Sequence, residues 1–330
     1  MSALLDTPFA YRTLEALGSV PGRFLPVADL LKRLGGHSDD LQRALVALRR
    51  VGYRVEAHPV AGICLRTEED VIRREAVQEG LETEALGRIL ACYLEVGSTN
   101  DLAVQAALEG APHGAVITAE HQRAGRGRRG RVWFSPPGVG LWFSAVVRFN
   151  LALYEMWMLT LGAGVAVVDA VREATGLAAD LKWPNDVRID GRKLAGILTE
   201  TRPGFAVLGI GINVNQEVRA FPDSLRKTAT SLRIESGRSQ ERSALLRALL
   251  YALESVYADL DANRICKLWK ARSTMWGQPV QVAGDGRVIE GVAEDLGPDG
   301  ALCVRTSGGV RVAVQAGGLA FRISESGLRM

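Results

Sequence analysis

A run of glycines interleaved with arginines constrains the fold of this chain more than any other feature. Within residues 119–131, AEHQRAGRGRRGR, five arginines and three glycines occur from Arg123 onward, with no acidic residue among them. Such a segment cannot pack as a strand or helix, so it is predicted to be a basic loop. Its planar guanidinium groups suit bidentate binding of phosphate or carboxylate. A solvated surface loop is the alternative that composition leaves open.

The rest of the chain has the composition of a globular protein with more than one domain. It has 330 residues, of which 47% are hydrophobic and 23% are charged, as in ordinary soluble proteins. At this length we expect two or three domains. The net charge is only +3, so the arginine-rich loop is more informative about ligands than the total charge is.

Cysteine usage and the N-terminal residues indicate a cytoplasmic protein. The four cysteines lie far apart and form no CxxC pair, and only four histidines accompany them. A zinc site or a disulfide framework is therefore not expected. The N-terminus has no apolar signal core, and the uncharged run at residues 156–168 is too short to cross a bilayer. We expect reduced thiols and no membrane partner.

Residues 1–68 are predicted to form a small helical domain that ends in a hairpin. Leu14 and Leu17 mark the first helix, and a second extends from Val27 to a glycine pair after Leu34. Ser38 is expected to cap a third helix, which Gly52 ends. The alternating residues 53–66 then indicate two short strands. Three helices followed by a hairpin is the order of a winged helix-turn-helix.

Charges around the third helix leave the role of this domain open. Asp39 and Asp40 begin the helix, where a DNA-reading helix meets phosphates, and they would repel them. Residues 1–68 hold nine Arg and Lys against seven Asp and Glu, a net charge of +2. Side chains that remain candidates for contacting a duplex are Gln42, Arg43, Arg49, Arg50 and Arg54. The alternatives are DNA binding and a regulatory or vestigial domain that packs against the rest of the chain.

Residues 69–272 are predicted to form a central α+β domain, with helices against one face of a mixed sheet. A charged connecting helix is expected within residues 67–85. The expected strands are residues 88–95, 114–119, 141–148, 181–189, 193–200 and 205–214, and the expected helices are 99–109, 156–175 and 243–260, the last being the final helix of the domain.

Residues 273–330 have a different pattern. Short alternating apolar runs are separated by glycine-containing turns at residues 284–286, 298–300 and 307–309, as in tight hairpins. This pattern predicts a small SH3-like β-barrel at the C-terminus.

Three further motifs accompany the glycine/arginine loop. GSTND (97–101) precedes it, and LKWPNDV (181–187) and GRKLAGIL (191–198) follow it. In this order and spacing the set resembles the biotin protein ligases, which adenylate biotin and transfer it to a lysine. The resemblance covers residues 85–325 well and the first 70 residues more loosely. It implies a central domain of the class II synthetase/biotin-lipoate ligase type, flanked in bifunctional members by the winged helix and the SH3-like domain.

The resemblance also implies roles for individual residues. Lys193 would bridge the biotin carboxylate and the α-phosphate of ATP, Lys182 would reach phosphate oxygens, and Arg128 would retain the adenylate. The ureido ring of biotin would meet Ser98, Thr99, Asn100 and Gln122. Further ligand contacts would come from Arg126, Gly127, Asn185, Asp186 and Asn213, and Asp186 is the candidate Mg²⁺ ligand.

Several of these positions have structural explanations as well. Ser98 is a natural helix N-cap, lysines at strand edges are commonly solvated, and Trp133 and Trp183 fit a core as well as a ligand wall. Residues 209–215, GIGINVN, lack the third glycine and the following helix of a dinucleotide-binding turn. His121 lies near the loop without a recognisable acid–base partner.

The sequence does not assign residues to the adenine ring or to deprotonation of the acceptor lysine. Residues 221–237 correspond to the segment that orders over adenine in relatives, but their sequence departs from the pattern. The base that deprotonates the acceptor lysine is not identified.

The resemblance implies an ATP-dependent biotin ligase that forms biotinyl-5′-AMP from biotin and ATP with Mg²⁺. The acceptor would be a lysine of the biotin carboxyl carrier protein of acetyl-CoA carboxylase. A transcriptional repressor that binds operator DNA, with ligation secondary, is one alternative, and a lipoate or octanoyl transferase is another. A homodimer is a further candidate assembly, and the sequence does not decide the oligomeric state.

Overall fold

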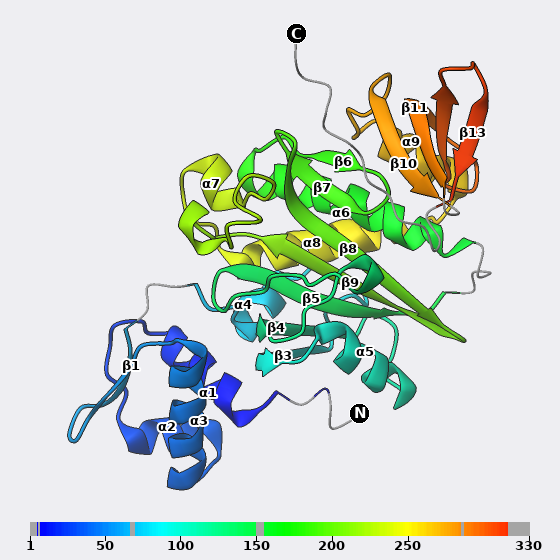
Figure 1. Cartoon of the computed structure of the whole chain (residues 1–330). Coiled ribbons are helices and arrows are strands. Elements are labelled where there is room, and N and C mark those ends of the chain that lie inside the picture. The colour runs from blue at the N-terminus through cyan, green and yellow to red at the C-terminus, as the bar shows by residue number, and fades with distance from the viewer. Residues whose placement is uncertain (1–4, 6, 67–69, 150–154, 285–286, 316–330) are drawn as a thin grey trace.

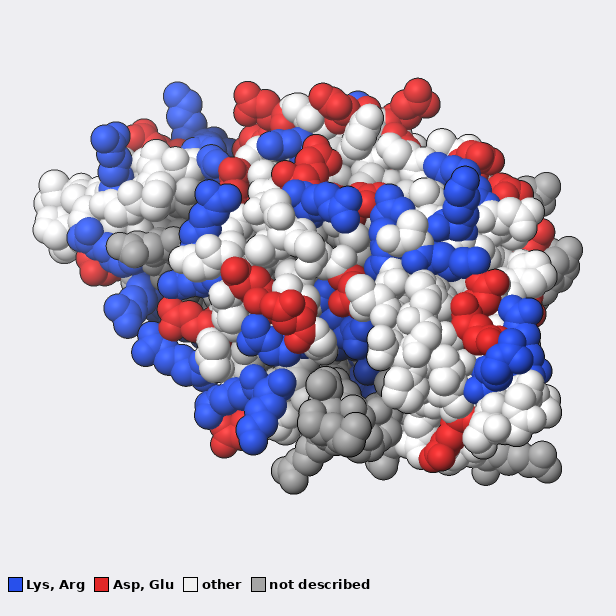
Figure 2. Space-filling view, turned by 90° about the horizontal axis from the view of Figure 1, so that it is seen from above, with Lys and Arg blue, Asp and Glu red and all other residues white. Residues whose placement is uncertain are grey.

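The computed structural model describes residues 5, 7–66, 70–149, 155–284 and 287–315. A helical N-terminal unit lies at one end of the molecule, a large central sheet lies in the middle, and a small C-terminal sheet lies at the other end (Figure 1). Basic and acidic side chains are interspersed over the face seen in Figure 2.

The N-terminal unit has the predicted order of three helices and a hairpin. It consists of α1 (Phe9–Gly18), α2 (Val27–Leu34), α3 (Ser38–Val51), β1 (Val55–His58) and β2 (Gly62–Leu65). Ser38 was expected to cap α3, and this is wrong, because His37 occupies the cap position. The carboxylate of Asp40 accepts a hydrogen bond from the His37 backbone at 2.9 Å, which closes a capping box one residue earlier.

The central sheet has seven strands in the order β3-β4-β5-β9-β8-β7-β6. Only β3 and β4 pair in parallel, and the other neighbours are antiparallel, so the predicted mixed sheet is confirmed. Its strands are β3 (Leu90–Val96), β4 (Val116–Gln122), β5 (Gly140–Val147), β6 (Asp180–Lys182), β7 (Asp186–Ile189), β8 (Arg192–Arg202) and β9 (Phe205–Asn213).

Helices cover both faces of this sheet, so the prediction of helices against one face is wrong. The helices α6 (Trp157–Thr175) and α8 (Arg242–Tyr257) pack together on one face, while α5 (Thr99–Leu108) contacts β4, β5 and β9. Along β5, Leu141, Phe143 and Ala145 belong to the core under α6 and α8, whereas Val146 belongs to the core under α5. The strict alternation of strand side chains makes both faces available.

Three elements differ from their predicted extents. The expected strand 181–189 is a hairpin of β6 and β7, because Pro184 has no backbone N–H to continue a strand ladder. The expected final helix 243–260 is followed by another, α9 (Ala262–Lys270), which Asp261 caps by accepting a hydrogen bond from the Arg264 backbone. The connecting segment contains only the short α4 (Arg74–Gln78) among its described residues.

The C-terminal residues form a four-stranded antiparallel sheet, β10 (Pro279–Gly284), β11 (Arg287–Leu296), β12 (Leu302–Thr306) and β13 (Arg311–Val314). Turns at residues 298–300 and 307–309 join consecutive strands as predicted, while residues 285–286 lie outside the described part of the chain. The indole N–H of Trp183 donates to the carbonyl of Gly300 at 3.0 Å. The C-terminal sheet therefore contacts the β6–β7 hairpin of the central domain.

The four cysteines are free and buried thiols. In the described ranges, none of the helices has the length and apolarity needed to cross a bilayer.

Tyr53 of the N-terminal unit contacts a buried ion pair of the central domain. Arg242 on α8 and Glu120 on β4 are fully buried, and their side chains lie 2.9 Å apart. The hydroxyl of Tyr53 donates to the same Glu120 oxygen at 2.9 Å, and Asp70 lies 3.4 Å from the Arg242 guanidinium. Burial by itself lowers the pKa of Arg242, but the charges of Glu120 and Asp70 outweigh burial and raise it above the usual value.

Removing the guanidinium should therefore destabilise the protein strongly. Arg242→Ala leaves Glu120 charged and buried without its cation, and we expect a loss of about 3–5 kcal/mol in the free energy of unfolding, measured by urea denaturation. The matched control is Arg272→Ala, which breaks a pair with Asp169 that is partly exposed and should cost about 1 kcal/mol or less. Equal losses in the two variants would contradict the structural role of the buried pair.

Candidate active site

One cavity of about 580 Å³ brings the predicted site residues together. This volume is typical of a small-molecule site. The cavity lies on the α5 face of the sheet, where it is enclosed by the glycine/arginine loop, the β6–β7 turn and residues 221–229. The predicted residues that line it are Ser98, Thr99, Asn100, Gln122, Arg126, Gly127, Arg128, Lys182, Asn185, Asp186, Lys193 and Asn213.

The floor of the cavity is made of glycines on two neighbouring strands. A Cβ atom at Gly209 would lie 2.1 Å from the side-chain oxygen of Asn100, and one at Gly211 would lie 2.4 Å from the indole nitrogen of Trp133. A Cβ atom at Gly196 would lie 3.0 Å from the ring of the same tryptophan. Only glycine allows these side chains to approach the strands so closely. Trp133 thus packs directly on the sheet as one wall of the cavity.

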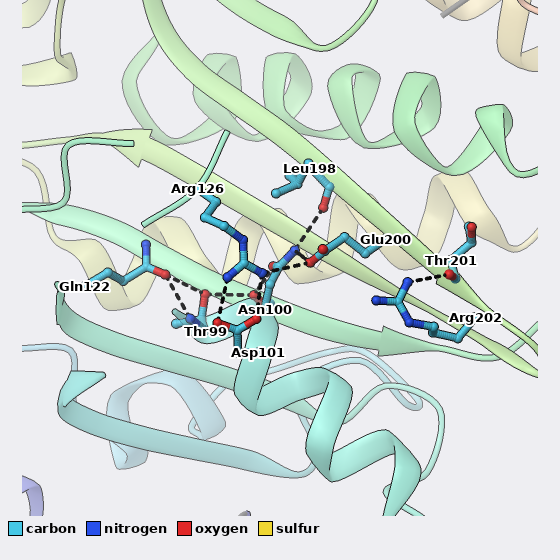
Figure 3. Close-up of polar contacts among 10 residues, drawn as sticks. Thr99, Asn100, Asp101, Gln122, Arg126, Leu198, Glu200, Thr201 and Arg202 are labelled. Carbon is cyan, nitrogen blue, oxygen red and sulfur yellow. Dashed lines mark hydrogen bonds and ion pairs between the residues drawn. The ribbon is translucent and has the colours of Figure 1, made fainter. Parts of the chain in front are cut away.

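A hydrogen-bonded network extends from the start of α5 to the foot of the loop (Figure 3). Gln122 accepts from the backbone N–H of Thr99 at 2.9 Å and lies 3.1 Å from its hydroxyl. Ser98 occupies the N-cap position of α5, but within the described residues its side chain makes no capping bond. Gln122 therefore takes over the capping that the sequence assigned to Ser98.

The same network occupies the side chain of Asn100. Its Oδ1 lies 2.6 Å from the hydroxyl of Ser144, and its Nδ2 donates to Glu200 at 2.7 Å. The residue is only 4% exposed. The predicted ligand contact at Asn100 is thus a residue that the protein already holds in a fixed orientation.

Positive side chains gather at the opposite end of the cavity. The ammonium of Lys193, on β8, lies 2.7 Å from Asp186 and 5.2 Å from the centre of the Trp133 ring. Arg128, at the tip of the loop, donates to Asn185 at 3.3 Å. Burial lowers the pKa of Arg128 below its usual value, and the neighbouring Arg129 acts in the same direction. Crowded, partly desolvated cations of this kind favour an anionic ligand.

Some residues of the site were missed in the sequence. Phe221, Leu225, Thr228 and Ala229 line the cavity, and the backbone of Thr228 accepts a hydrogen bond from that of Lys193 at 2.7 Å. This segment was recognised as a counterpart of an adenine-covering loop, but its sequence gave no signal for individual contacts. Asp101 and Glu200, which pair with Arg126, were also missed, because only the fold brings them together.

The structure also shows the contacts of Asn213 and His121, which the sequence had singled out. Asn213 donates to the backbone of Lys193 at 3.4 Å and accepts from Gln216 at 3.4 Å. His121 lies 3.2 Å from Glu95 and is outside the set of described residues that line the cavity. In the part of the chain that the structure describes, no three His, Cys, Asp or Glu side chains form a metal-binding cluster.

Comparisons with known proteins agree with this geometry. Residues 94–217 match the model of the biotin/lipoate A/B protein ligase family, and residues 276–321 match that of the biotin protein ligase C-terminal domain. The chain is 33% identical over 306 residues to the bifunctional ligase/repressor BirA of Bacillus subtilis, covering 90% of this chain and 94% of that relative. It is 36% identical over 264 residues to a biotin–(acetyl-CoA-carboxylase) ligase of Mycobacterium tuberculosis, covering 76% and 97%.

A solved structure is also similar. The biotin protein ligase of Aquifex aeolicus in complex with biotin and ATP has a TM-score of 0.63 and 29% identity, covering 71% of this chain and 99% of that chain. The fold and the basic cavity therefore define a ligase with a mixed central sheet and a C-terminal antiparallel sheet. The chain belongs to the biotin protein ligase family.

The glycine floor generates a testable prediction. Gly209→Ala forces Asn100 out of its position, so we expect the affinity for biotin, measured by calorimetry, to fall by about tenfold or more, the cost of leaving one buried polar group unpaired. Gly97→Ala is the matched control, because a Cβ atom there has no described atom within 4 Å. If both variants bind biotin as tightly as the unmodified protein, the floor does not shape the ligand site.

Proposed function

We propose that this protein is an ATP-dependent biotin ligase that forms biotinyl-5′-AMP and then transfers biotin to a lysine of a carrier protein. The observation that carries the proposal is the convergence of Lys193 and Arg128 on one glycine-floored cavity of about 580 Å³. Relatives with this name and a similar structure with biotin and ATP support it. The proposed acceptor is the biotin carboxyl carrier protein of acetyl-CoA carboxylase.

The reaction has an electrostatic problem that the cavity can solve. The biotin carboxylate must attack the α-phosphorus of ATP, forming an O–P bond while the bond to the β-phosphate breaks and pyrophosphate leaves. Both reactants are anions, so fixed cations must offset their repulsion. Lys193 is proposed for this role. Support comes from its ammonium, which pairs with Asp186 and lies over Trp133 at the wall of the cavity.

Lys182 and Arg128 are proposed to share this task. Lys182 ends β6 and lines the same cavity, so it is assigned to phosphate oxygens. Arg128 reaches the cavity from the opposite side, on the loop, where its bond to Asn185 joins the loop to the β6–β7 turn. A cation on the covering element is suited to retain the adenylate after pyrophosphate has left.

The neutral ureido end of biotin is assigned to the other end of the cavity. Ser98, Thr99 and Gln122 lie there beside the glycine floor, with Asn100 held behind them. A dry pocket with fixed donors and acceptors suits a planar ring that needs both kinds of partner. Asn213, beside the backbone of Lys193, is proposed to contact the adenylate.

Mg²⁺ is proposed to accompany ATP, where it neutralises phosphate charge. Asp186 supplies one carboxylate to the cavity, and Mg²⁺ commonly takes one or two carboxylates together with substrate phosphates. The donor set therefore fits an ion held mainly by the nucleotide, with Asp186 as its protein ligand.

The domain division follows from the same family pattern. We propose a winged helix-turn-helix domain at residues 1–68, the ligase domain at 69–272 and an SH3-like domain at 273–330. The helix order of α1 to α3 with its hairpin, and the four-stranded meander from β10 to β13, support these assignments. A cytoplasmic location is proposed as well, since four buried free thiols suit a reducing compartment.

The direct test is biotin-dependent exchange of labelled pyrophosphate into ATP, followed by labelling of a carrier domain. Lipoate is run side by side, because the matching family model covers biotin and lipoate ligases. Activity with biotin but not with lipoate supports the proposal. Preference for lipoate would instead establish the alternative function, a lipoate or octanoyl transferase.

The proposed role of Lys193 gives a quantitative prediction. Lys193→Ala should lower the rate of pyrophosphate exchange by about 10²-fold or more, the scale of removing one charged stabiliser of the transition state. Lys270→Ala is the matched control. Lys270 pairs with Asp295 at 2.6 Å, and neither residue is among the described residues that line the cavity. An exchange rate near normal in Lys193→Ala would refute the assignment.

Binding of operator DNA is proposed as a second function. The names of relatives such as the Bacillus subtilis ligase/repressor and the order of α1 to α3 favour it. A homodimer would present two such domains to a palindromic site. Two candidate arginines of α3 have protein partners in this structure, Arg43 with Asp40 and Arg50 with Glu95, so DNA would have to compete with these carboxylates.

A gel-shift titration with operator-like DNA, biotin and ATP tests this function. We expect binding that weakens as salt increases, and Arg43→Ala should weaken it by about fivefold, as for loss of a phosphate contact. Arg264→Ala, on the distant α9, should leave binding unchanged. Absence of any DNA affinity at low salt would remove the repressor function.

A further inference from the structure

We infer that Arg126 is the anchor of the glycine/arginine loop, held by Asp101 and Glu200, and that it positions Arg128 rather than contacting the ligand itself. The inference rests on the proposed ligase function, because it concerns how the loop retains the adenylate. It assigns a role to Asp101, the last residue of the GSTND motif, and to Glu200.

The first observation is the geometry around the Arg126 guanidinium (Figure 3). Its two terminal nitrogens donate to the two carboxylate oxygens of Asp101, each at 2.6 Å, and one of them lies 3.5 Å from Glu200. Such a planar, bidentate pair fixes both the distance and the orientation of the side chain. The hydrogen bond to Asp101 also raises the pKa of Arg126 above its usual value. The guanidinium is thus directed toward α5 and β8.

The second observation is that the loop is a stiff hairpin above this anchor. Arg126 pairs with Val132 as an antiparallel bridge. On either side of that pair, the backbone of Gly127 donates to Arg131 at 2.7 Å, and that of Trp133 donates to Gly125 at 2.8 Å. Residues 128–130 form the short turn at the tip. Because the strands of the hairpin are bonded together, fixing Arg126 also fixes the position of Arg128 two residues later.

The third observation is that the feet of the hairpin join the same network. The amide of Gln122, before the hairpin, donates to the hydroxyl of Ser135, after it, at 3.0 Å. Gln122 also bonds to Thr99, which lies 2.8 Å from Ser144. The anchor and the feet are therefore two attachment points of one hairpin on the start of α5.

Glu200 connects the anchor to the proposed biotin pocket. The same oxygen, Oε2, accepts from Asn100 at 2.7 Å and lies 3.5 Å from Arg126. A ligand that contacts Asn100 would therefore act, through this hydrogen bond, on the carboxylate on which the loop rests. The network gives the loop a route to respond to occupation of the cavity without a direct bond between Arg126 and the ligand.

The decisive measurement is release of biotinyl-5′-AMP. The complex is formed from labelled biotin and ATP, then chased with unlabelled biotin and ATP while the bound label is followed. Asp101→Asn removes the charge from the more exposed partner, and we expect release about fivefold faster, the upper range for a partly exposed ion pair. Release at the unmodified rate would overturn the inference.

A comparison of Arg126→Ala in two backgrounds separates anchoring from ligand contact. Arg126→Ala should accelerate release in the unmodified protein, but by less than about twofold when Asp101→Ala and Glu200→Gln are already present, because the partners it acts through are gone. If Arg126→Ala has its full effect in that background, Arg126 contacts the ligand directly and the inference is wrong.

The controls distinguish this inference from the proposed function. Asp169→Asn disrupts a bidentate pair with Arg272, at 2.7 and 2.8 Å, that lies outside the cavity-lining residues, and it should leave release unchanged. If the unmodified protein forms no adenylate, the proposed function fails. If the unmodified protein forms and retains the adenylate, and the Asp101→Asn variant retains it equally well, the proposed function stands and only the anchoring role of Arg126 is refuted.

A second measurement needs no ligand. Trypsin cuts after arginines, so its rate of cleavage within residues 126–131 reports how often the hairpin leaves the protein surface. Asp101→Asn should increase this rate by about fivefold, and Asp169→Asn should not. Equal cleavage of Asp101→Asn and the unmodified protein would overturn the anchor independently of any activity.

Discussion

Repulsion among like charges is the constraint on which the site depends. The loop concentrates arginines above a cavity that also holds Lys193, and such cations would separate unless acidic groups and hydrogen bonds held them. The structure provides these at fixed points: Asp101 and Glu200 for Arg126, Asp186 for Lys193, and Asn185 for Arg128. The cations stay close together because each has its own partner: on α5 and β8 for Arg126, on β7 for Lys193, and in the β6–β7 turn for Arg128.

The central sheet provides both a rigid support for the cavity and the space in which Trp133 and Asn100 lie. Glycines at 196, 209 and 211 remove side chains from alternate positions of β8 and β9, so Trp133 and Asn100 can lie directly on the strands. The opposite face of the same strands packs under α6 and α8. One set of strands thus has a closely packed core on one face and a cavity on the other, and the strand alternation keeps the two apart.

Tyr53 links the N-terminal unit to the buried pair of Arg242 and Glu120 in the central domain. Glu120 lies two residues before Gln122 on β4. The same strand therefore provides the carboxylate that accepts the hydrogen bond from Tyr53 and the side chain that caps α5. The third helix makes its own contact through Arg50 and Glu95 on β3. The N-terminal unit therefore packs on the strands that position the start of the glycine/arginine loop.

The sequence by itself determined the local elements and the class of chemistry. Leucine spacing located α1 to α3, strand alternation located most of the central sheet, and the motifs around the loop identified the residues that meet in the cavity. These signals are local or arranged along the chain, so they can be read without knowing the fold. The cap of α3 was predicted wrongly, as Ser38 instead of His37, because several neighbouring side chains can compete for one backbone donor.

Only the tertiary structure decided which side chains are partners. Asp101 and Glu200 are 99 residues apart in sequence, and no pattern connects either to Arg126, because the pairing exists only when α5, β8 and the loop are brought together. The placement of α5 on the opposite face from α6, and the use of Asn100 within the protein, arise in the same way. Ion pairs and hydrogen bonds act over a few ångströms, so they are set by the folded arrangement and not by spacing along the chain.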